Sequence, residues 1–378
     1  MMMSDMPQDL IEEILSRVPA ASLKRLRSTC KRWNNLFKDQ RFTEKHFRKS
    51  PKHSRVLMLN DYRICSVNVD LNVAPPPIEF KDFHSCSQQQ VDVVEVFHCN
   101  GLLLCNTHKD NKYRLMVWNP CLGETRWIQT TTNNSKSFYK CSIALGYQNN
   151  KSFRSYKILN CWSTSSSLDQ GDAGFEIYEL SSDSSRRVLD GDLALDCSTL
   201  TNCGVSMKGN GYWLVVEKTG TYLLLGFDFT SDSFRRFCLP PVSFPWIMAL
   251  SVVREEKLSM LHWSPETSYM EVWVTNEIDT QASLWSKSFT VKNPDIFSPC
   301  IKSFLIDEEK KVVLGCNNWD FHGDSKKLYT VGEDNEYYTE ITSVESKNKT
   351  LSPSIFSYVP SLVQIQHGGS NETNNTSR

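Results

Sequence analysis

The chain has many cysteines but lacks the close cysteine pairs that metal sites need. Its 378 residues include 13 cysteines, spread from Cys30 to Cys316, with no C-x-x-C pair among them. A structural zinc site closes its tetrahedron with paired ligands, so this spacing argues against a metal. Four histidines share no metal-ligand spacing either: His98, His108, His262 and His322. We therefore expect no metal and no cofactor, and interpret the thiols as small buried side chains of a reducing compartment.

Long apolar runs are absent as well. The best candidate, residues 242–253, is interrupted by Pro245, whereas a membrane-spanning helix needs about 18 apolar residues in succession. The first five residues, MMMSD, show no basic stretch followed by an apolar core, which a secretory leader would have. These absences predict a protein of the cytoplasm, the nucleus or both, without membrane contact.

The common catalytic motifs are missing too. Neither the P-loop nor the dinucleotide-binding glycine pattern occurs. A glycosidase-type site needs two facing carboxylates, and scattered acids such as Asp196, Asp228 and Asp320 neither support nor exclude one. No cysteine stands out as an activated nucleophile. We assign no catalytic residue and expect catalysis to belong to partners.

Charge is balanced overall but not locally. The formal net charge is −1, yet residues 24–52 contain eleven Lys or Arg against two acids, Asp39 and Glu44, which gives that segment a charge of +9. A solvated helical face would explain this excess, and so would an acidic protein partner or nucleic acid. Because no nucleic-acid-binding motif accompanies the basic residues, we favour the acidic protein partner over nucleic acid.

The first 48 residues carry the periodicity of short helices. Two apolar stripes have helical spacing: Leu10, Ile11, Ile14, Leu15 and Val18, then Leu23, Leu26, Cys30, Trp33 and Phe37. Pro7 suits a first helical turn, Pro19 stops the first helix, and Ser28 or Thr29 could cap a break in the second stripe. Three or four helices in so few residues cannot bury enough surface to fold alone, so a partner surface is expected.

This segment resembles a known family. Residues 6–37, MPQDLIEEILSRVPAASLKRLRSTCKRWNNLF, are similar in order and spacing to a plant F-box, with Met6 where Leu is usual. The resemblance implies a helical hook that docks on an acidic adaptor of the Skp family, which links in turn to a cullin scaffold and a RING protein. It also implies a set of adaptor contacts: Pro7, Leu10, Ile14, Leu15, Pro19, Leu23, Cys30 and Trp33. The alternative, that these stripes pack on the chain's own second domain, stays open.

From residue 54 to about 366 the pattern changes to short strands between turn residues. Aromatic residues in apolar strands recur at intervals of 46 to 60 residues: Trp118, Tyr178, Phe227, Trp273 and Tyr329. Each follows one apolar strand and precedes another, so about three strands recur at least five times, and residues 54–69 offer a further pair. This periodicity predicts a propeller-like domain of roughly six blades, with Trp118, Phe227 and Trp273 in the core between blades.

The glycine doublets of kelch repeats and the Trp-Asp pairs of WD repeats do not recur. Four segments instead resemble the F-box-associated type 1 domain: HCNGLL at 98–103, VWNP at 117–120, LGY at 145–147 and YVPSLV at 358–363. From the residues themselves, Asn100-Gly101 is interpreted as a turn that enters a strand and Asn119-Pro120 as one that leaves a strand. The expected organisation is an all-α F-box at 1–48, a linker at 49–53, an all-β domain at 54–366 and a disordered tail at 367–378, which is α+β by segments.

The segments point to a substrate receptor of a cullin-RING (SCF-type) ubiquitin ligase. Such a receptor would dock through the F-box and present a target on loops at one face of the propeller. The candidate loops are residues 163–174, 240–247, 263–269 and 319–324, and no single target-binding residue can be named. Two alternatives remain: an interaction module that binds the adaptor without degrading anything, and a propeller hydrolase with an incidental helical cap.

Overall fold

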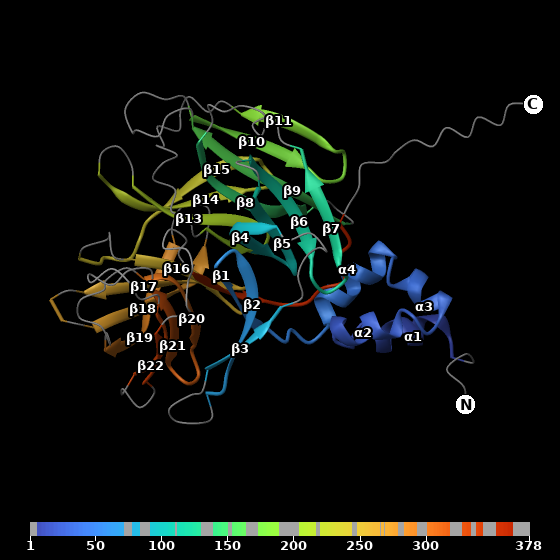
Figure 1. Cartoon of the computed structure of the whole chain (residues 1–378), viewed down its shortest axis with the longest axis horizontal. Helices are drawn as coiled ribbons and strands as arrows, with labels where there is room; N and C mark the ends of the chain where they lie inside the picture. The colour runs from blue at the N-terminus through green and yellow to red at the C-terminus, as the bar shows by residue number, and fades with distance from the viewer. Residues whose placement is uncertain are drawn as a thin grey trace, which may run out of the picture.

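A computed structural model gives the fold as a small helical unit mounted on one face of a β-propeller (Figure 1). The structure describes residues 6–71, 78–83, 91–109, 112–129, 139–149, 153–163, 173–188, 204–216, 220–243, 248–264, 266–267, 269–278, 283–292, 301–317, 327–333, 338–342 and 353–365. Within this part of the chain, four helices precede six four-stranded antiparallel sheets. The predicted tail, residues 367–378, lies outside the described residues.

The helical unit consists of four short helices: α1 (Gln8–Leu15), α2 (Ala20–Leu26), α3 (Lys31–Leu36) and α4 (Gln40–Lys49). Pro7 and Pro19 stand at the N-caps of α1 and α2, where a missing N–H is harmless. Asp39 caps α4 by accepting from the backbone N–H of Arg41 and Phe42. Ser28 and Thr29 do not cap α3. Their hydroxyls donate to the last carbonyls of α2 instead.

Each blade is a four-stranded sheet, one strand more than the sequence pattern predicted. Blade 1 contains β24 (Ser354–Tyr358), β1 (Arg55–Asn60), β2 (Arg63–Val69) and β3 (Ile78–Asp82). Blade 2 contains β4 (Asp92–Cys99), β5 (Leu102–Lys109), β6 (Lys112–Asn119) and β7 (Glu124–Ile128). Blade 3 contains β8 (Tyr139–Asn149), β9 (Arg154–Ser163), β10 (Ala173–Glu179) and β11 (Ser184–Val188).

The remaining blades follow the same order from the inside outwards. Blade 4 contains β12 (Val205–Met207), β13 (Asn210–Val216), β14 (Tyr222–Asp228) and β15 (Ser233–Phe237). Blade 5 contains β16 (Met248–Val253), β17 (Lys257–Ser264), β18 (Tyr269–Ile278) and β19 (Ser283–Lys292). Blade 6 contains β20 (Ile301–Asp307), β21 (Val312–Asn317), β22 (Lys327–Gly332) and β23 (Tyr338–Thr342).

The ring is closed by joining the two ends of the domain. The last strand, β24, pairs antiparallel with β1, with Leu57 opposite Phe356. It takes the innermost place in blade 1, whereas the innermost strand of every other blade is also the first of that blade in sequence. A closed ring leaves no exposed inner edge. In Figure 1 the first segment of the domain (blue) and the last (red) lie side by side in blade 1.

The aromatic residues that defined the repeat pack between blades. Trp118 is 4% exposed in a cluster with β1 and β24 residues, and Phe227 is 2% exposed in a cluster that joins blades 2, 3 and 4. Trp273 is partly buried beside the cluster between blades 4 and 5. The prediction that these three rings belong to the core is confirmed, because large rings fill the wedge between neighbouring sheets.

Charged side chains also join neighbouring blades. Arg126 of blade 2 donates to Leu180 O at 2.7 Å and to the Asp183 carboxylate at 2.7 Å in blade 3. One blade further on, Lys157 donates to Phe229 O at 3.1 Å and to Asp232 at 2.9 Å. In both cases the accepting carbonyl and the aspartate are three residues apart in the sequence. Both lie in the turn that precedes the outermost strand of the neighbouring blade. We call each of these arrangements an inter-blade staple.

Candidate functional site

The outward face of α1 presents an exposed apolar pair. Leu10 is 53% and Ile14 is 45% exposed, whereas Ile11 and Leu15, on the adjoining face of the same helix, are 3% and 2% exposed. Residues four apart stand one above the other on a helix, so Leu10 and Ile14 form a continuous apolar strip. We call these two residues, with the exposed Pro7 at the helix start, the α1 strip.

Part of the basic excess of residues 24–52 is paired with acids of the same chain. Glu13 of α1 accepts from Lys49 at 2.7 Å and lies within ion-pair distance of Arg17 and Lys45, and these cations lower its pKa to about 2. Lys52 pairs with Glu255 of the propeller at 2.9 Å. The count of basic residues in the sequence could not show that some of them pair with acids of the same chain.

Apolar and polar contacts seat the helical unit on the propeller. Phe42 and Leu23 belong to one cluster with Cys121 of blade 2 and Leu362, which follows β24. The Gln364 side chain donates to Phe37 O at 3.2 Å. We call the propeller side of this junction, residues 119–124 and 359–365, the platform.

Arg154 adds a second contact at the edge of the platform. Its guanidinium lies 3.7 Å from the ring centroid of Phe47 in α4 and 4.9 Å from that of Tyr147 in blade 3. It also pairs with Glu44 of α4 at 3.5 Å, with both side chains mostly buried. A guanidinium held between two rings and a carboxylate resists sliding of α4 over the propeller.

The segments that resemble the F-box-associated domain build the platform. The Asn119 side chain is fully buried, and its Nδ2 donates to Ser361 O at 3.3 Å and Val363 O at 2.6 Å. Gly101 has φ +78°, and a Cβ there would lie 2.5 Å from Ser361 Oγ and 2.7 Å from Val359 O. Both turn interpretations are correct locally. The sequence did not reveal that these turns hold a segment about 240 residues away.

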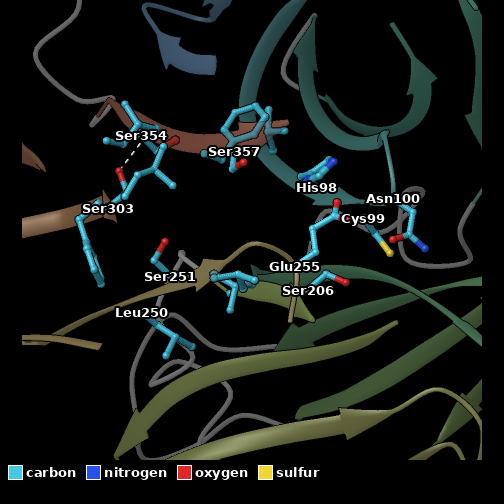
Figure 2. Close-up of a pocket in the computed structure, with 18 of the residues that line it drawn as sticks. His98, Cys99, Asn100, Ser206, Leu250, Ser251, Glu255, Ser303, Ser354 and Ser357 are labelled. Carbon is cyan, nitrogen blue, oxygen red and sulfur yellow. Dashed lines mark hydrogen bonds between the residues drawn. The ribbon is translucent and has the colours of Figure 1, made fainter. Parts of the chain in front are cut away.

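A cavity of about 110 Å³, lined by both polar and apolar residues, lies among the innermost strands of five blades. Figure 2 shows its labelled residues around an open centre, with His98 and Glu255 toward one end and Leu250, Ser303 and Ser354 toward the other. Five serines line it: Ser206, Ser251, Ser303, Ser354 and Ser357. The Ser303 hydroxyl accepts from Ile355 N at 2.8 Å, which ties β20 to β24.

His98 and Glu255 define the end of the cavity nearest the helical unit. His98 Nε2 accepts from Gly101 N at 3.0 Å, and its ring stacks on Phe356 at 6.4 Å between centroids. Burial lowers the pKa of His98 to about 4, although the nearby Glu255 carboxylate opposes this shift. His98 is therefore neutral near pH 7, with its proton on Nδ1. Glu255 also lines a narrow cavity of about 20 Å³ beneath α4.

Comparisons with known proteins decide the family. Residues 3–45 match the family model described as "F-box domain", and residues 55–365 match the one described as "F-box associated beta propeller domain". The chain is an F-box protein. It belongs to the F-box proteins that carry an F-box-associated propeller, and the helical unit is its F-box.

Relatives from Arabidopsis thaliana share this organisation. The chain is 53% identical to one named as an F-box/kelch-repeat protein, over 98% of this chain and 99% of the relative. It is 52% identical to another named as an F-box protein, over 84% of this chain and 93% of the relative. A solved chain of a nidogen/laminin complex is 13% identical with a TM-score of 0.43 over 82% of this chain and all of the other, which is too distant to support an argument.

The eight F-box residues predicted to contact the adaptor differ in their exposure to solvent. Pro7, Leu10 and Ile14 are exposed, and three more residues are partly exposed: Pro19, Cys30 and Trp33. Leu15 and Leu23, in contrast, are 2% and 0% exposed inside the cluster that joins the F-box to the platform. These two residues pack on the chain itself, which is the alternative that the sequence left open, and adaptor contact by the eight residues stays a prediction.

The predicted target-binding loops are only partly described. Residues 240–243 are described, and most of 163–174 and all of 319–324 lie outside the described residues, as do positions 265 and 268. The strands that these four segments connect nevertheless end on one face. Each segment either enters an innermost strand or joins the second strand of a blade to the third. These connections all lie on the face of the propeller opposite the turns that meet the F-box.

Within the described residues, no group of three or more His, Cys, Asp or Glu could hold a metal ion. No helix of that part of the chain is long and apolar enough to cross a membrane. Several cysteines of that part of the chain are buried, including Cys99, Cys105 and Cys316. Cys238 is exposed, which differs from the uniformly buried thiols expected from the sequence.

Proposed function

We propose that this F-box protein is the substrate-recognition subunit of an SCF-type cullin-RING ubiquitin ligase. Its F-box would dock on a Skp-family adaptor, and the adaptor would connect it to cullin and RING subunits. The observation that carries this proposal is the α1 strip, where the large apolar side chains of Leu10 and Ile14 are exposed, whereas those of Ile11, Leu15, Leu23, Leu36, Phe37 and Phe42 are buried in one cluster. An exposed apolar strip on a rigid support is the usual mark of a protein contact.

In this proposal the receptor is not itself an enzyme. The propeller would hold a target protein on the face opposite the F-box, and the partners would supply the catalytic cysteine and the ubiquitin. The receptor contributes proximity, because it raises the local concentration of acceptor lysines beside the charged ubiquitin carrier. It would act in the cytoplasm, the nucleus or both.

The test of docking uses surface residues only. The double variant Leu10→Asp, Ile14→Asp should bind a plant Skp-family adaptor at least about 100-fold more weakly, because two aliphatic side chains contribute about 3 kcal/mol when buried. Tyr113→Asp, which changes a 52% exposed apolar residue on the propeller, is the matched control. Adaptor binding by the folded double variant at the strength of the control would refute the docking proposal.

A second measurement separates the ligase subunit from a module that binds the adaptor without degrading anything. Both the double variant and the wild-type chain are used to capture proteins while the proteasome is blocked. Proteins that only the double variant captures are target candidates. Their lifetimes should lengthen when the double variant replaces the wild-type chain. Unchanged lifetimes with intact adaptor binding would favour the non-degradative module.

A further inference from the structure

The cavity at the centre of the propeller has the lining of a binding site for a small polar molecule. Its volume of about 110 Å³ is close to that of a cavity that holds one small ring or several waters. Serine side chains from four different blades face it, and a hydroxyl can both donate and accept a hydrogen bond. The lining therefore suits a ligand that also offers both.

Charge in the cavity is largely balanced. Glu255, the one acidic residue that lines it in the described part of the chain, already pairs with Lys52 at 2.9 Å. His98 is neutral near pH 7, and Lys208 reaches the cavity from an exposed turn, where water screens its charge. A charged ligand would lose its hydration without gaining a dedicated buried counter-charge, which is unfavourable. The charge distribution therefore favours a neutral ligand.

One wall of the cavity is flat and aromatic. Phe356 of β24 stacks with His98 of β4, with 28° between the ring planes. The C–H face of a small hydroxylated ring could lie on such a surface while its hydroxyl groups reach the serines.

We propose that the central cavity binds a neutral small molecule that carries several hydroxyl groups, of the size of a single sugar or cyclitol ring. This inference does not depend on the ligase proposal. The site communicates with the F-box junction, because Asn100 and Glu255 line both the central cavity and the narrow cavity beneath α4. A ligand that contacts Glu255 would hold it in place for Lys52.

The experiment measures binding of myo-inositol to the purified full chain, by calorimetry and by hydrogen exchange. Inorganic phosphate is the charged probe. Ser357→Leu places a bulky side chain in the cavity, and Ser184→Leu makes the same change at an exposed position on β11 as the control. Wild type and the control should bind myo-inositol with equal affinity, and Ser357→Leu should bind at least about tenfold more weakly.

Hydrogen exchange tests the location in the wild-type chain alone, so the proposal stays testable even if Ser357→Leu fails to fold. Saturating myo-inositol should protect amides of residues 98–101 and 354–358 and leave those of β11 unchanged. Three results would overturn the proposal: no saturable binding at millimolar myo-inositol, protection confined to residues outside the cavity, or tighter binding of phosphate than of myo-inositol. None of these results would affect adaptor docking through Leu10 and Ile14.

Discussion

At the scale of single residues, Gly101 meets two constraints at once. Its φ of +78° lies in the left-handed region, and a Cβ would collide with Ser361 and Val359 of the platform. Gly101→Ala should therefore destabilise the protein by about 3 kcal/mol, from backbone strain and from displacement of the platform.

Gly123 supplies the matched control for Gly101. It has a similar φ of +75°, but a Cβ there would meet nothing within 4 Å. Gly123→Ala should lower the free energy of unfolding by only about 1 kcal/mol, because backbone strain is then the single cause. Urea unfolding of both variants measures the difference, and equal losses of stability would show that the contact with Ser361 contributes nothing.

The half-buried imidazole of His98 predicts a pH dependence of stability. Its pKa falls from an ordinary 6.5 to about 4 in the folded chain, so the unfolded chain binds the proton more readily. The stabilisation is therefore complete above pH 6.5 and is lost as the pH falls from 6.5 toward 4. Burial also lowers the pKa of His46, which adds a loss of the same sign.

Urea unfolding at about pH 7 and about pH 5 tests this dependence. In His98→Gln, the side-chain oxygen can still accept from Gly101 N, but the titrating group is gone. The variant should lose less stability than wild type between the two pH values. A loss as large as that of wild type would exclude His98 as the source.

Residue roles were predictable from the sequence only where local geometry decides them. Asn100-Gly101 and Asn119-Pro120 are turns, as their residue types indicate. That Asn119 holds Ser361 and Val363 could not be foreseen, because the contact bridges distant parts of the chain. Similarly, helical spacing placed Leu10 and Leu15 in one stripe without showing that the fold exposes the first and buries the second.

At the scale of elements, the inter-blade staples explain how neighbouring sheets keep their register. Lys157 is 3% exposed and its partner Asp232 is 14% exposed. Arg186 also pairs with Asp232, so removal of the lysine would mainly take away the buried donor to Phe229 O and one of the two cations beside the carboxylate. Lys157→Met should lower the free energy of unfolding by about 3 kcal/mol.

The control for Lys157 is an ion pair between blades 5 and 6 that water surrounds. Arg254 pairs with Glu309 where both side chains are more than two-thirds exposed. Arg254→Met should leave stability unchanged within error, because solvent screens such pairs. Thermal and urea unfolding compare the two variants, and an equally mild Lys157→Met would mean that the staple adds no stability.

The closing strand β24 predicts a sharp difference between two truncations. A chain that ends after residue 353 lacks the innermost strand of blade 1 and residues 359–365 of the platform, and should lose cooperative unfolding. A chain that ends after residue 366 keeps both and should melt within about 2 °C of the full chain. Circular dichroism melting distinguishes them, and a cooperative transition in the shorter chain would contradict the closing role of β24.

The blade number was predictable because the inter-blade rings recur, but the fourth strand of each blade was not. β12 has only three residues and β11 is mostly polar, so neither shows an apolar alternation. β24 was harder still. It completes a sheet whose other strands lie at the opposite end of the domain, a pairing that no local pattern encodes.

At the scale of the whole molecule, the F-box is fixed to the propeller by contacts independent of the α1 strip. Arg154→Ala would remove the guanidinium between Phe47, Tyr147 and Glu44, which contributes about 1.5 kcal/mol when mostly buried. Amide exchange in α4 should then become roughly tenfold faster, while adaptor affinity stays unchanged.

Hydrogen exchange by mass spectrometry measures this loosening. Arg17→Ala is the control, since Arg17 follows α1, is 67% exposed and pairs with Glu13 of that helix. If α4 exchanged at the wild-type rate in Arg154→Ala, the junction would be held by the platform cluster alone. A loss of adaptor affinity would instead mean that the docking surface and the junction are not separate.

The platform also links F-box seating to the order of synthesis. The F-box leaves the ribosome first, whereas Leu362 and Gln364, on which it rests, are among the last described residues to be made. A nascent chain, or one cut short by a premature stop codon, would carry its α1 strip without a finished propeller. Such a fragment would occupy adaptors without holding any target, so incomplete copies of the gene product would act as competitors of the intact ones.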